Sequence, residues 1–388
     1  TFQTDIWLSS SNFGEITSTV DGAELQLGEA MTPISLSYTS QDGHQTAPVN
    51  VTGNGSIWWD NQDIFCDCGE HMAIHHGNTI YMDGIASGSA GHELYAYSID
   101  TGMSWLVADI NPSGDSVPGE RMSVLIDNTI IFDADNGVHG RELWAHNVLT
   151  NTTWLVKDIN PVVTYPSMIG EYFTEVMDGV LYFDAKNDTA NNVEIWGFNP
   201  QNGTAWNVTD IFENGNAAYP GQYMTHVVGD TLYFGGREDA PWPYPHSHEL
   251  WAYTATNQTT WLAADINPGS SASYPGGDFS VVVGDTIYFD AITTTGANVA
   301  DRKIIAYDTS NYTHWVVTDV DQSDTMVFRN HNPMTYLGVI GSTIYTIGTN
   351  YIGMGSNSYS NNVIWAINTV NETAWQVPNF PCLYNSGC

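Results

Sequence analysis

One pattern recurs along the whole sequence, and no other feature constrains the fold as strongly. Its clearest copy spans residues 249–268, where Glu249-Leu250-Trp251 is followed by a polar turn, by Trp261 and by Asp265-Ile266-Asn267-Pro268. The other copies open with the triplets Glu93-Leu94-Tyr95, Glu142-Leu143-Trp144, Glu194-Ile195-Trp196, Lys303-Ile304-Ile305 and Val363-Ile364-Trp365. Self-similarity at a fixed period is the signature of a repeat architecture.

Upstream of each triplet, two short apolar runs flank a two-residue turn. The turn dipeptides are Gly77-Asn78, Asp127-Asn128, Asp178-Gly179, Gly229-Asp230, Gly284-Asp285 and Gly341-Ser342. Because Gly, Asn and Asp tolerate the positive φ of a tight turn, each pair of runs predicts a β-hairpin. The triplet and the following Trp run form a second hairpin, so that each repeat is predicted to contain four strands.

Residues 15–67 are interpreted as a seventh, degenerate copy, with Asp21-Gly22 as its hairpin turn. The seven turns are 50 to 57 residues apart. Four short strands at that period are typical of a β-propeller blade, which shares its core with its neighbours. We therefore predict an all-β propeller of seven four-stranded blades over residues 15–380. Residues 1–14 would be an N-terminal strand, and residues 381–388 a tail that carries cysteines.

The charge of the chain is strongly unbalanced. Its 388 residues include 43 acidic and only 8 basic ones, which gives a net charge of −35. Nucleic acid and anionic membranes are poor partners for such a field. Divalent cations, acidic or salty media and neutral sugars remain compatible. The 14 Trp, 21 Tyr and 13 Phe are expected to pack between blades.

The sequence is that expected of a processed, secreted protein, since it lacks an initiator Met, is poor in Lys and has four cysteines. No run approaches the roughly 20 apolar residues of a membrane-spanning helix. Cys66 or Cys68 is expected to pair with Cys382 or Cys388, because a bridge between Cys66 and Cys68 would close a strained ring. The alternative is a metal site that combines Cys66 and Cys68 with the nearby Glu70, His71, His75 and His76.

Sequons for N-glycosylation recur a few residues before the Trp of the fourth strand. Those on this turn begin at Asn151, Asn202, Asn257, Asn311 and Asn371, and others begin at Asn50, Asn54, Asn187 and Asn207. Asn is also an ordinary turn residue, which is the alternative explanation. The middle residue of the five turn sequons varies freely, so we predict glycosylation.

The repeat resembles the ELW repeat, of the form ELWxxDGTxxGTxLVKDINPG, found in secreted and cell-surface proteins of microorganisms. The likeness covers about residues 72–320. This chain departs from it by placing Asn-x-Thr where the family has Asp-Gly-Thr and Gly-Thr turns. The resemblance implies a propeller fold and an extracellular location, and it implies no particular chemistry.

One loop predicts a calcium site. Asp133, Asp135, Asn136 and Glu142 alternate oxygen ligands around Gly137, although over a shorter span than in an EF-hand loop. The alternative is an exposed hairpin loop. Ca²⁺ is therefore the one cofactor that we predict.

No catalytic motif stands out. The sequence has no Gly-x-Ser-x-Gly elbow, no His-Glu-x-x-His and no Gly-rich phosphate loop. The repeated Asp109, Asp158, Asp210, Asp265 and Asp319 are expected to cap the turn that leaves each blade by accepting backbone amides.

Residues 1–14 contain Ile6-Trp7-Leu8, which would be apolar on both faces of a strand. Such a strand could pair with the edge of another copy and so build a filament. We therefore predict a non-enzymatic extracellular structural or adhesive protein whose partner is itself. The alternative is a carbohydrate-binding propeller, either a lectin or a glycan-cleaving enzyme.

Overall fold

A computed structural model describes most of the repeats. It covers residues 16–18, 34–38, 49–51, 64–65, 68–86, 91–162, 166–187, 193–209, 218–237, 248–269, 272–296, 299–318, 335–352 and 359–377. Two compact units are present, Thr1–Phe65 with Ala86–Gly88 and Cys66–Ile85 with Ser89–Cys388.

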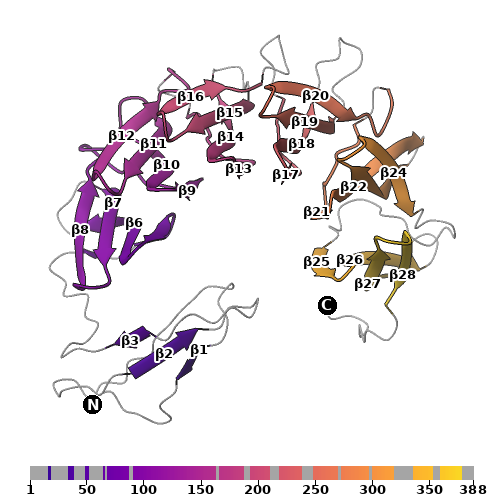
Figure 1. Ribbon diagram of the computed structural model, residues 1–388, viewed down its shortest axis with the longest axis horizontal. Helices are drawn as coiled ribbons and strands as arrows, with labels where there is room; N and C mark the ends of the chain where they lie inside the picture. The colour runs from indigo at the N-terminus through magenta and orange to yellow at the C-terminus, as the bar shows by residue number, and fades with distance from the viewer. Residues whose placement is uncertain are drawn as a thin grey trace. The chain divides into compact units, whose positions relative to one another are not determined.

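In the described part of the larger unit, four consecutive strands pair in chain order in each of six antiparallel sheets (Figure 1). The first strands are β5 (Ala73–His76), β9 (Ser123–Ile126), β13 (Thr174–Met177), β17 (Thr225–Val228), β21 (Ser280–Val283) and β25 (Thr335–Ile340). The second strands are β6 (Thr79–Ala86), β10 (Thr129–Asp135), β14 (Val180–Lys186), β18 (Thr231–Arg237), β22 (Thr286–Gly296) and β26 (Thr343–Ile352).

The third strands are β7 (His92–Ser98), β11 (Arg141–Asn147), β15 (Val193–Asn199), β19 (His248–Thr254), β23 (Val299–Asp308) and β27 (Tyr359–Asn368). The fourth strands are β8 (Met103–Ala108), β12 (Thr152–Lys157), β16 (Thr204–Asn207), β20 (Thr259–Ala264), β24 (Thr313–Thr318) and β28 (Thr373–Gln376). The prediction of an all-β propeller with six clear four-stranded repeats is confirmed.

The hydrophobic core lies between consecutive sheets. Leu94 of β7 packs with Phe132 of β10 in one cluster, and Leu143 of β11 packs with Phe183 of β14 in the next. Three further clusters join the remaining pairs of neighbouring sheets in the same way. Each sheet therefore buries its faces against its neighbours, as a propeller blade does.

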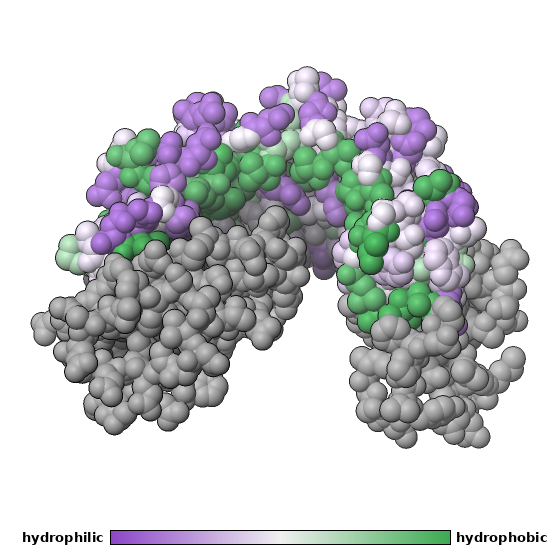
Figure 2. All heavy atoms as spheres, turned by 60° about the horizontal axis from the view of Figure 1, so that its bottom comes forward, coloured by the Kyte–Doolittle hydropathy of each residue, from purple (hydrophilic) through white to green (hydrophobic). Residues whose placement is uncertain are grey.

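The two sets of repeated Trp residues differ in burial. In the third strands, Trp196 and Trp251 are buried within the clusters between sheets. In the fourth strands, which form the sheet edges, Trp105 and Trp375 are exposed by 39% and 41%. On the face that Figure 2 shows, hydrophobic patches alternate with hydrophilic residues along these sheets. Inter-blade packing thus explains the buried Trp residues of the third strands and also Trp261 and Trp315 of the fourth strands, which pack against the clusters, but it does not explain Trp105 and Trp375.

Each sheet has two different ends. At the turn end, the two hairpin turns lie together, as the hydrogen bonds from Val148 N to Asn128 O and from Ala255 N to Asp230 O show. At the loop end lie the connection between the second and third strands and the link to the next sheet. The predicted glycosylation turns are at the turn end.

The smaller unit contains a three-stranded antiparallel sheet of β1 (Ile16–Ser18), β2 (Ile34–Tyr38) and β3 (Val49–Val51), and the two-residue strand β4 (Ile64–Phe65). Most of residues 15–67, all of residues 1–14 and the tail 381–388 lie outside the described residues. The seventh blade, the N-terminal strand and the domain boundaries at 14 and 380 therefore stay predictions. In the described part of the chain, no helix is long and apolar enough to cross a membrane.

At the entry to four of the described sheets, a glycine fits closely against the preceding sheet; these are Gly119, Gly170, Gly221 and Gly276. Gly221 has φ +77, and a Cβ there would lie 2.6 Å from the Phe173 ring. We predict that Gly221→Ala lowers the free energy of unfolding by about 2–3 kcal/mol, since it combines a left-handed backbone with an overlap. Gly229→Ala is the matched control, because φ is +62 there but nothing lies within 4 Å of the added Cβ.

Chemical denaturation measures both variants. The control should lose only the backbone contribution of about 1 kcal/mol. Equal losses in the two variants would contradict the importance of the contact with Phe173.

Candidate functional site

The Glu of the Glu-Leu-Trp triplet is a buried structural acceptor. Glu142 Oε2 accepts the Ile159 amide at 2.7 Å, and its other oxygen accepts the Ser167 hydroxyl. Glu249 does the same with the Ile266 amide at 2.8 Å and the Ser273 amide at 3.1 Å. These carboxylates therefore cap the turn before the next blade, a role that we predicted for Asp158 and Asp265. Burial raises the pKa of Glu142 and of Glu249 to about 7.

A second buried carboxylate, predicted from the sequence only as a calcium ligand, has a structural role that the sequence reasoning missed. Asp133 Oδ1 accepts the amides of Arg121 at 3.1 Å and Met122 at 3.0 Å, at the entry to β9. Asp83, Asp184 and Asp290 accept the corresponding pairs of amides in their own sheets. The signal was a recurring aromatic or Met residue followed by Asp in the second strand, as in Phe132-Asp133 and Phe183-Asp184.

The partner of this Asp differs between sheets. Asp133 receives the Arg141 guanidinium at 2.8 Å, and Arg141 also contacts Glu120 at 2.7 Å. Asp184 has Val193 at the position equivalent to Arg141, and its Oδ2 is buried without a hydrogen-bond partner. Burial raises the pKa of Asp184 to about 7.

The predicted calcium ligands do not converge. Glu142 pairs with Ala134 across the strands and Arg141 pairs with Asp135. Because side chains alternate along a strand, Asp133 and Asp135 point to one face of the sheet and Glu142 to the other. Asn136 Oδ1 accepts the amides of Val138 and His139 within the exposed loop. The described residues contain no group of three or more His, Cys, Asp or Glu that could hold a metal. Calcium binding stays a prediction, and the arrangement of the four predicted ligands does not support it.

Four of the predicted glycosylation sites share one local geometry. In the turns that begin at Asn202, Asn257, Asn311 and Asn371, the Asn Oδ1 accepts both the amide and the hydroxyl of the Thr two residues later. Asn151 instead occupies the next position of its turn, with φ +51, and Thr153 bonds to His146. Asn187 and Asn207 are half-buried and exposed. Asn54 and the side chain of Asn50 lie outside the described residues.

Among the cysteines, the structure describes only Cys68, which is disulfide-bonded. Its side chain lies against β6, where a Cβ on Gly84 would be 3.4 Å from the sulfur. Cys66, Cys382 and Cys388 lie outside the described residues, so the predicted pairing between the two ends of the chain stays a prediction.

Positive charge gathers at the loop end. All described Lys and Arg side chains lie in the loop-end half of their sheets, namely Arg121, Arg141, Lys157, Lys186, Arg237 and Lys303. The described turn ends carry only acidic charges, among them Asp100, Asp127, Asp178, Asp230, Asp285 and Glu372. A ligand that needs cationic hydrogen-bond donors can therefore find them only at the loop end of the described sheets.

A group of aromatic side chains surrounds one of these cations. We call it the loop-end tyrosine surface, and its members are Tyr172, Tyr219, Tyr223, Arg237, His248 and Tyr274. They come from the loops before β13, β17 and β21, from the end of β18 and from the start of β19.

Arg237 has no acidic partner among the described residues. Its guanidinium carbon lies over the Tyr219 ring, 5.4 Å from the centroid, and Tyr172 meets Tyr219 edge to face at 5.9 Å. Arg121 and Arg141, by contrast, form ion pairs with nearby carboxylates. A guanidinium group has five N–H donors, which suit the oxygens of a ligand.

His248 holds two exposed rings in place. Tyr274 stacks on it at 5.4 Å, and Tyr223 meets both rings edge to face, at 5.3 Å from His248 and 5.5 Å from Tyr274. Burial, and then the charge of Arg237, lower the pKa of His248 to about 3, so that it is neutral at ordinary pH. Tyr223 and Tyr274 are exposed by 37% and 36%. Together they form an uncharged aromatic platform beside a cation.

The sequence carried a signal for this surface that our reasoning did not use. Tyr-Pro-Gly occurs at residues 219–221 and again at 274–276, in equivalent loops. Both Tyr residues have positive φ, +45 and +47, which bulky residues rarely adopt. Val117 and Met168 occupy the equivalent positions of two other sheets with φ +42 and +51, so this backbone conformation belongs to the repeated turn and only the Tyr side chains are particular to these two loops.

Comparison with known proteins finds solved structures of distant similarity. No family model and no curated protein matches the sequence. An oligogalacturonate lyase in complex with manganese is 13% identical over 77% of this chain and 73% of its own, with a TM-score of 0.41. An oligogalacturonate lyase from Vibrio parahaemolyticus is 11% identical over 90% and 86%, also with a TM-score of 0.41. A prolyl endopeptidase is 11% identical over 94% of this chain and 50% of its own, with a TM-score of 0.43.

These findings correct one prediction. The similar structures are enzymes, which contradicts the prediction of a non-enzymatic structural or adhesive protein. Their substrates are properties of those proteins, and at such identities the likeness is one of fold. The ligand of this chain must be argued from its own residues.

Proposed function

We propose that the protein is a carbohydrate-recognising propeller that binds a saccharide on the loop-end tyrosine surface. Arg237 is the main support, because it is a cation without an acidic partner among the described residues and its guanidinium lies over the Tyr219 ring. Aromatic faces pack against the C–H faces of a sugar ring, while guanidinium donors suit hydroxyl and carboxylate oxygens. A few fixed polar groups among aromatic side chains are typical of small-ligand sites.

The net charge of the chain limits which saccharides are expected to bind. A field from a net charge of −35 repels a densely anionic polymer. A neutral saccharide, or one with an isolated carboxylate placed at Arg237, fits both this field and the local cation.

We also propose that the protein acts outside the cell. The disulfide at Cys68 and the sequons on exposed turns support an extracellular location, since disulfides persist in oxidising compartments. The resemblance to ELW repeats agrees with that location.

The proposal predicts which side chains govern binding. Calorimetric titration with a panel of neutral and uronate-containing oligosaccharides identifies a ligand, which is then measured with Tyr223→Ala and Arg237→Gln. Each substitution should weaken binding at least about tenfold, or about 1.4 kcal/mol, because it removes stacking area or charged donors. The control Tyr312→Ala, at the turn end, should change binding by less than about twofold.

The same incubations are assayed for new reducing ends, which separates a lectin from a glycan-cleaving enzyme. Unchanged affinity in both loop-end variants, or no binding by any saccharide of the panel, would overturn the proposal.

A further inference from the structure

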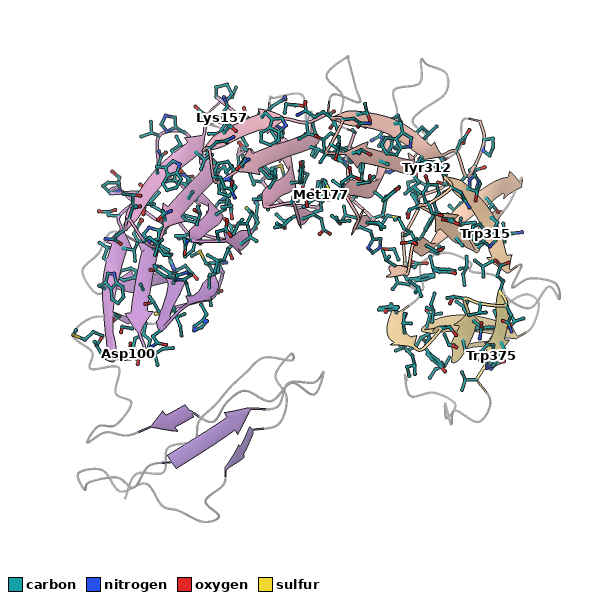
Figure 3. The ribbon with its side chains drawn as sticks, viewed as in Figure 1. Asp100, Lys157, Met177, Tyr312, Trp315 and Trp375 are labelled. Carbon is teal, nitrogen blue, oxygen red and sulfur yellow. The ribbon has the colours of Figure 1, made fainter. Side chains whose placement is uncertain are left out.

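A polar hollow of about 500 Å³ lies at the turn end, between the sheet β17–β20 and the turn that joins β23 to β24. The residues that matter in its wall are Asp230, Thr256, Asn257, Thr259, Trp261 and Tyr312. Tyr312, labelled in Figure 3, reaches it from the following sheet. It contains none of the loop-end tyrosine surface.

The aromatic part of the wall has the form of a corner. The rings of Trp261 and Tyr312 are perpendicular, with centroids 6.4 Å apart. Tyr312 is 63% exposed and is presented by a turn with φ +60. Two ring faces at right angles can enclose the apolar face and edge of a pyranose ring.

The remaining wall supplies hydrogen-bonding oxygens. The Thr256 hydroxyl donates to Asp230 Oδ2 at 2.5 Å, and Asp230 Oδ1 accepts from Thr231 at 3.3 Å. Hydroxyl and carboxylate oxygens beside an aromatic corner match a ligand that is apolar on its faces and hydroxylated at its rim.

The Asn257 amide lies in the same wall. Its Oδ1 accepts the Thr259 amide at 3.2 Å and the Thr259 hydroxyl at 2.6 Å. No described residue bonds to its Nδ2, which is the atom that an N-linked glycan would occupy. In Asn311 the corresponding Nδ2 donates to Asp308 at 2.8 Å.

We propose that the hollow seats the first sugars of a glycan attached to Asn257 of the same chain, with Tyr312 closing over them. Asn257, the residue of attachment, lines the hollow, which argues for this occupant over a free saccharide. The inference does not rest on the loop-end ligand site.

The chain provides a matched control. Asn202 has the same turn geometry as Asn257, with its Oδ1 bonded to Thr204. In the sheet after Asn202, Gln258 occupies the turn position that Tyr312 occupies after Asn257. A glycan on Asn202 therefore lacks the second aromatic ring.

The test uses the full chain expressed in a host that adds high-mannose glycans. Endoglycosidase H is added to the folded protein, and peptide mass spectrometry follows trimming at Asn257 and Asn202 in the same molecules. Trimming at Asn257 should be at least about tenfold slower, because the core sugars must leave the hollow before the enzyme reaches them. Tyr312→Ala should bring the two rates within about twofold.

Equal rates in the unmodified chain, a bare Asn257, or a rate difference that survives Tyr312→Ala would each overturn the inference. Arg237→Gln should leave the trimming rates unchanged, so that failure of the loop-end proposal is recognised separately.

Discussion

Arg141→Val should lower the free energy of unfolding by about 3–5 kcal/mol at neutral pH, the usual cost of removing one partner from a buried ion pair. Arg141 is 8% exposed and bonds to the fully buried Asp133 at 2.8 Å, to Glu120 at 2.7 Å and to the carbonyl of Val117 at 2.8 Å. Valine is the residue that the next sheet carries at this position, Val193, so the substitution reproduces an arrangement that the fold already contains.

Two further variants distinguish loss of the buried Arg141–Asp133 ion pair from a nonspecific loss of stability. Arg121→Val removes a surface pair with Glu171 at 3.7 Å and should cost less than about 1 kcal/mol. Adding Asp133→Asn to Arg141→Val should recover part of the loss, because no uncompensated charge then remains. Urea unfolding measures all three. A loss for Arg141→Val no larger than that for Arg121→Val would contradict the assignment.

Acid should stabilise the protein. Glu142, Glu249 and Asp184 have pKa values raised to about 7 by burial, above the values of 4.5 and 3.8 for exposed groups. The folded state therefore keeps protons that the unfolded chain releases, and the free energy of unfolding rises as pH falls from about 7 towards about 4.5. Each shift is worth about 3–4 kcal/mol at most.

Buried histidines oppose this trend at lower pH. Burial lowers the pKa of His146 to about 4 and, with the charge of Arg237, that of His248 to about 3. The unfolded chain takes up these protons first, so stability is lost as pH falls below about 6.5. As pH falls from alkaline values, self-repulsion from the net charge of −35 also weakens, and this further raises the free energy of unfolding. The melting temperature should therefore be highest at about pH 5–6 and several degrees lower at about pH 8.

Glu142→Gln tests the cause of the pH dependence. The neutral amide can still accept the Ile159 amide while donating to Ser167. It should raise the free energy of unfolding by about 1–3 kcal/mol at about pH 8 and change it little at about pH 5, because the carboxyl is already protonated there. Calorimetry at both values decides this. A variant that is less stable at the higher pH would contradict the raised pKa.

The strand order and the blade boundaries follow from the sequence alone. Dipeptides such as Asp178-Gly179 and Gly284-Asp285 set each hairpin locally, and apolar runs on both sides supply the strands. Repetition then requires that each unit packs against its neighbour. These determinants lie within a few residues of one another, which is why periodicity was sufficient to find them.

The chemistry of the repeated acidic residues needed the tertiary structure. Glu142 and Asp158 are both regularly spaced, and only the fold shows that Glu142 accepts the Ile159 amide. The calcium ligands were grouped by spacing, but strand alternation sends Asp133 and Glu142 to opposite faces. Sequence spacing gives the distance along the chain, whereas coordination depends on the direction of each side chain.

The two proposed saccharide sites also arise only in three dimensions. Tyr172 and Arg237 come from separate segments and both contact Tyr219, because consecutive sheets pack side by side. Trp261 and Tyr312 belong to neighbouring sheets, and their rings meet edge to face for the same reason. The sequence by itself determined the repeated sheet, because short-range turns and alternation encode it. Packing between sheets decided which side chains share a surface, because residues about 50 positions apart come into contact only when blades stack.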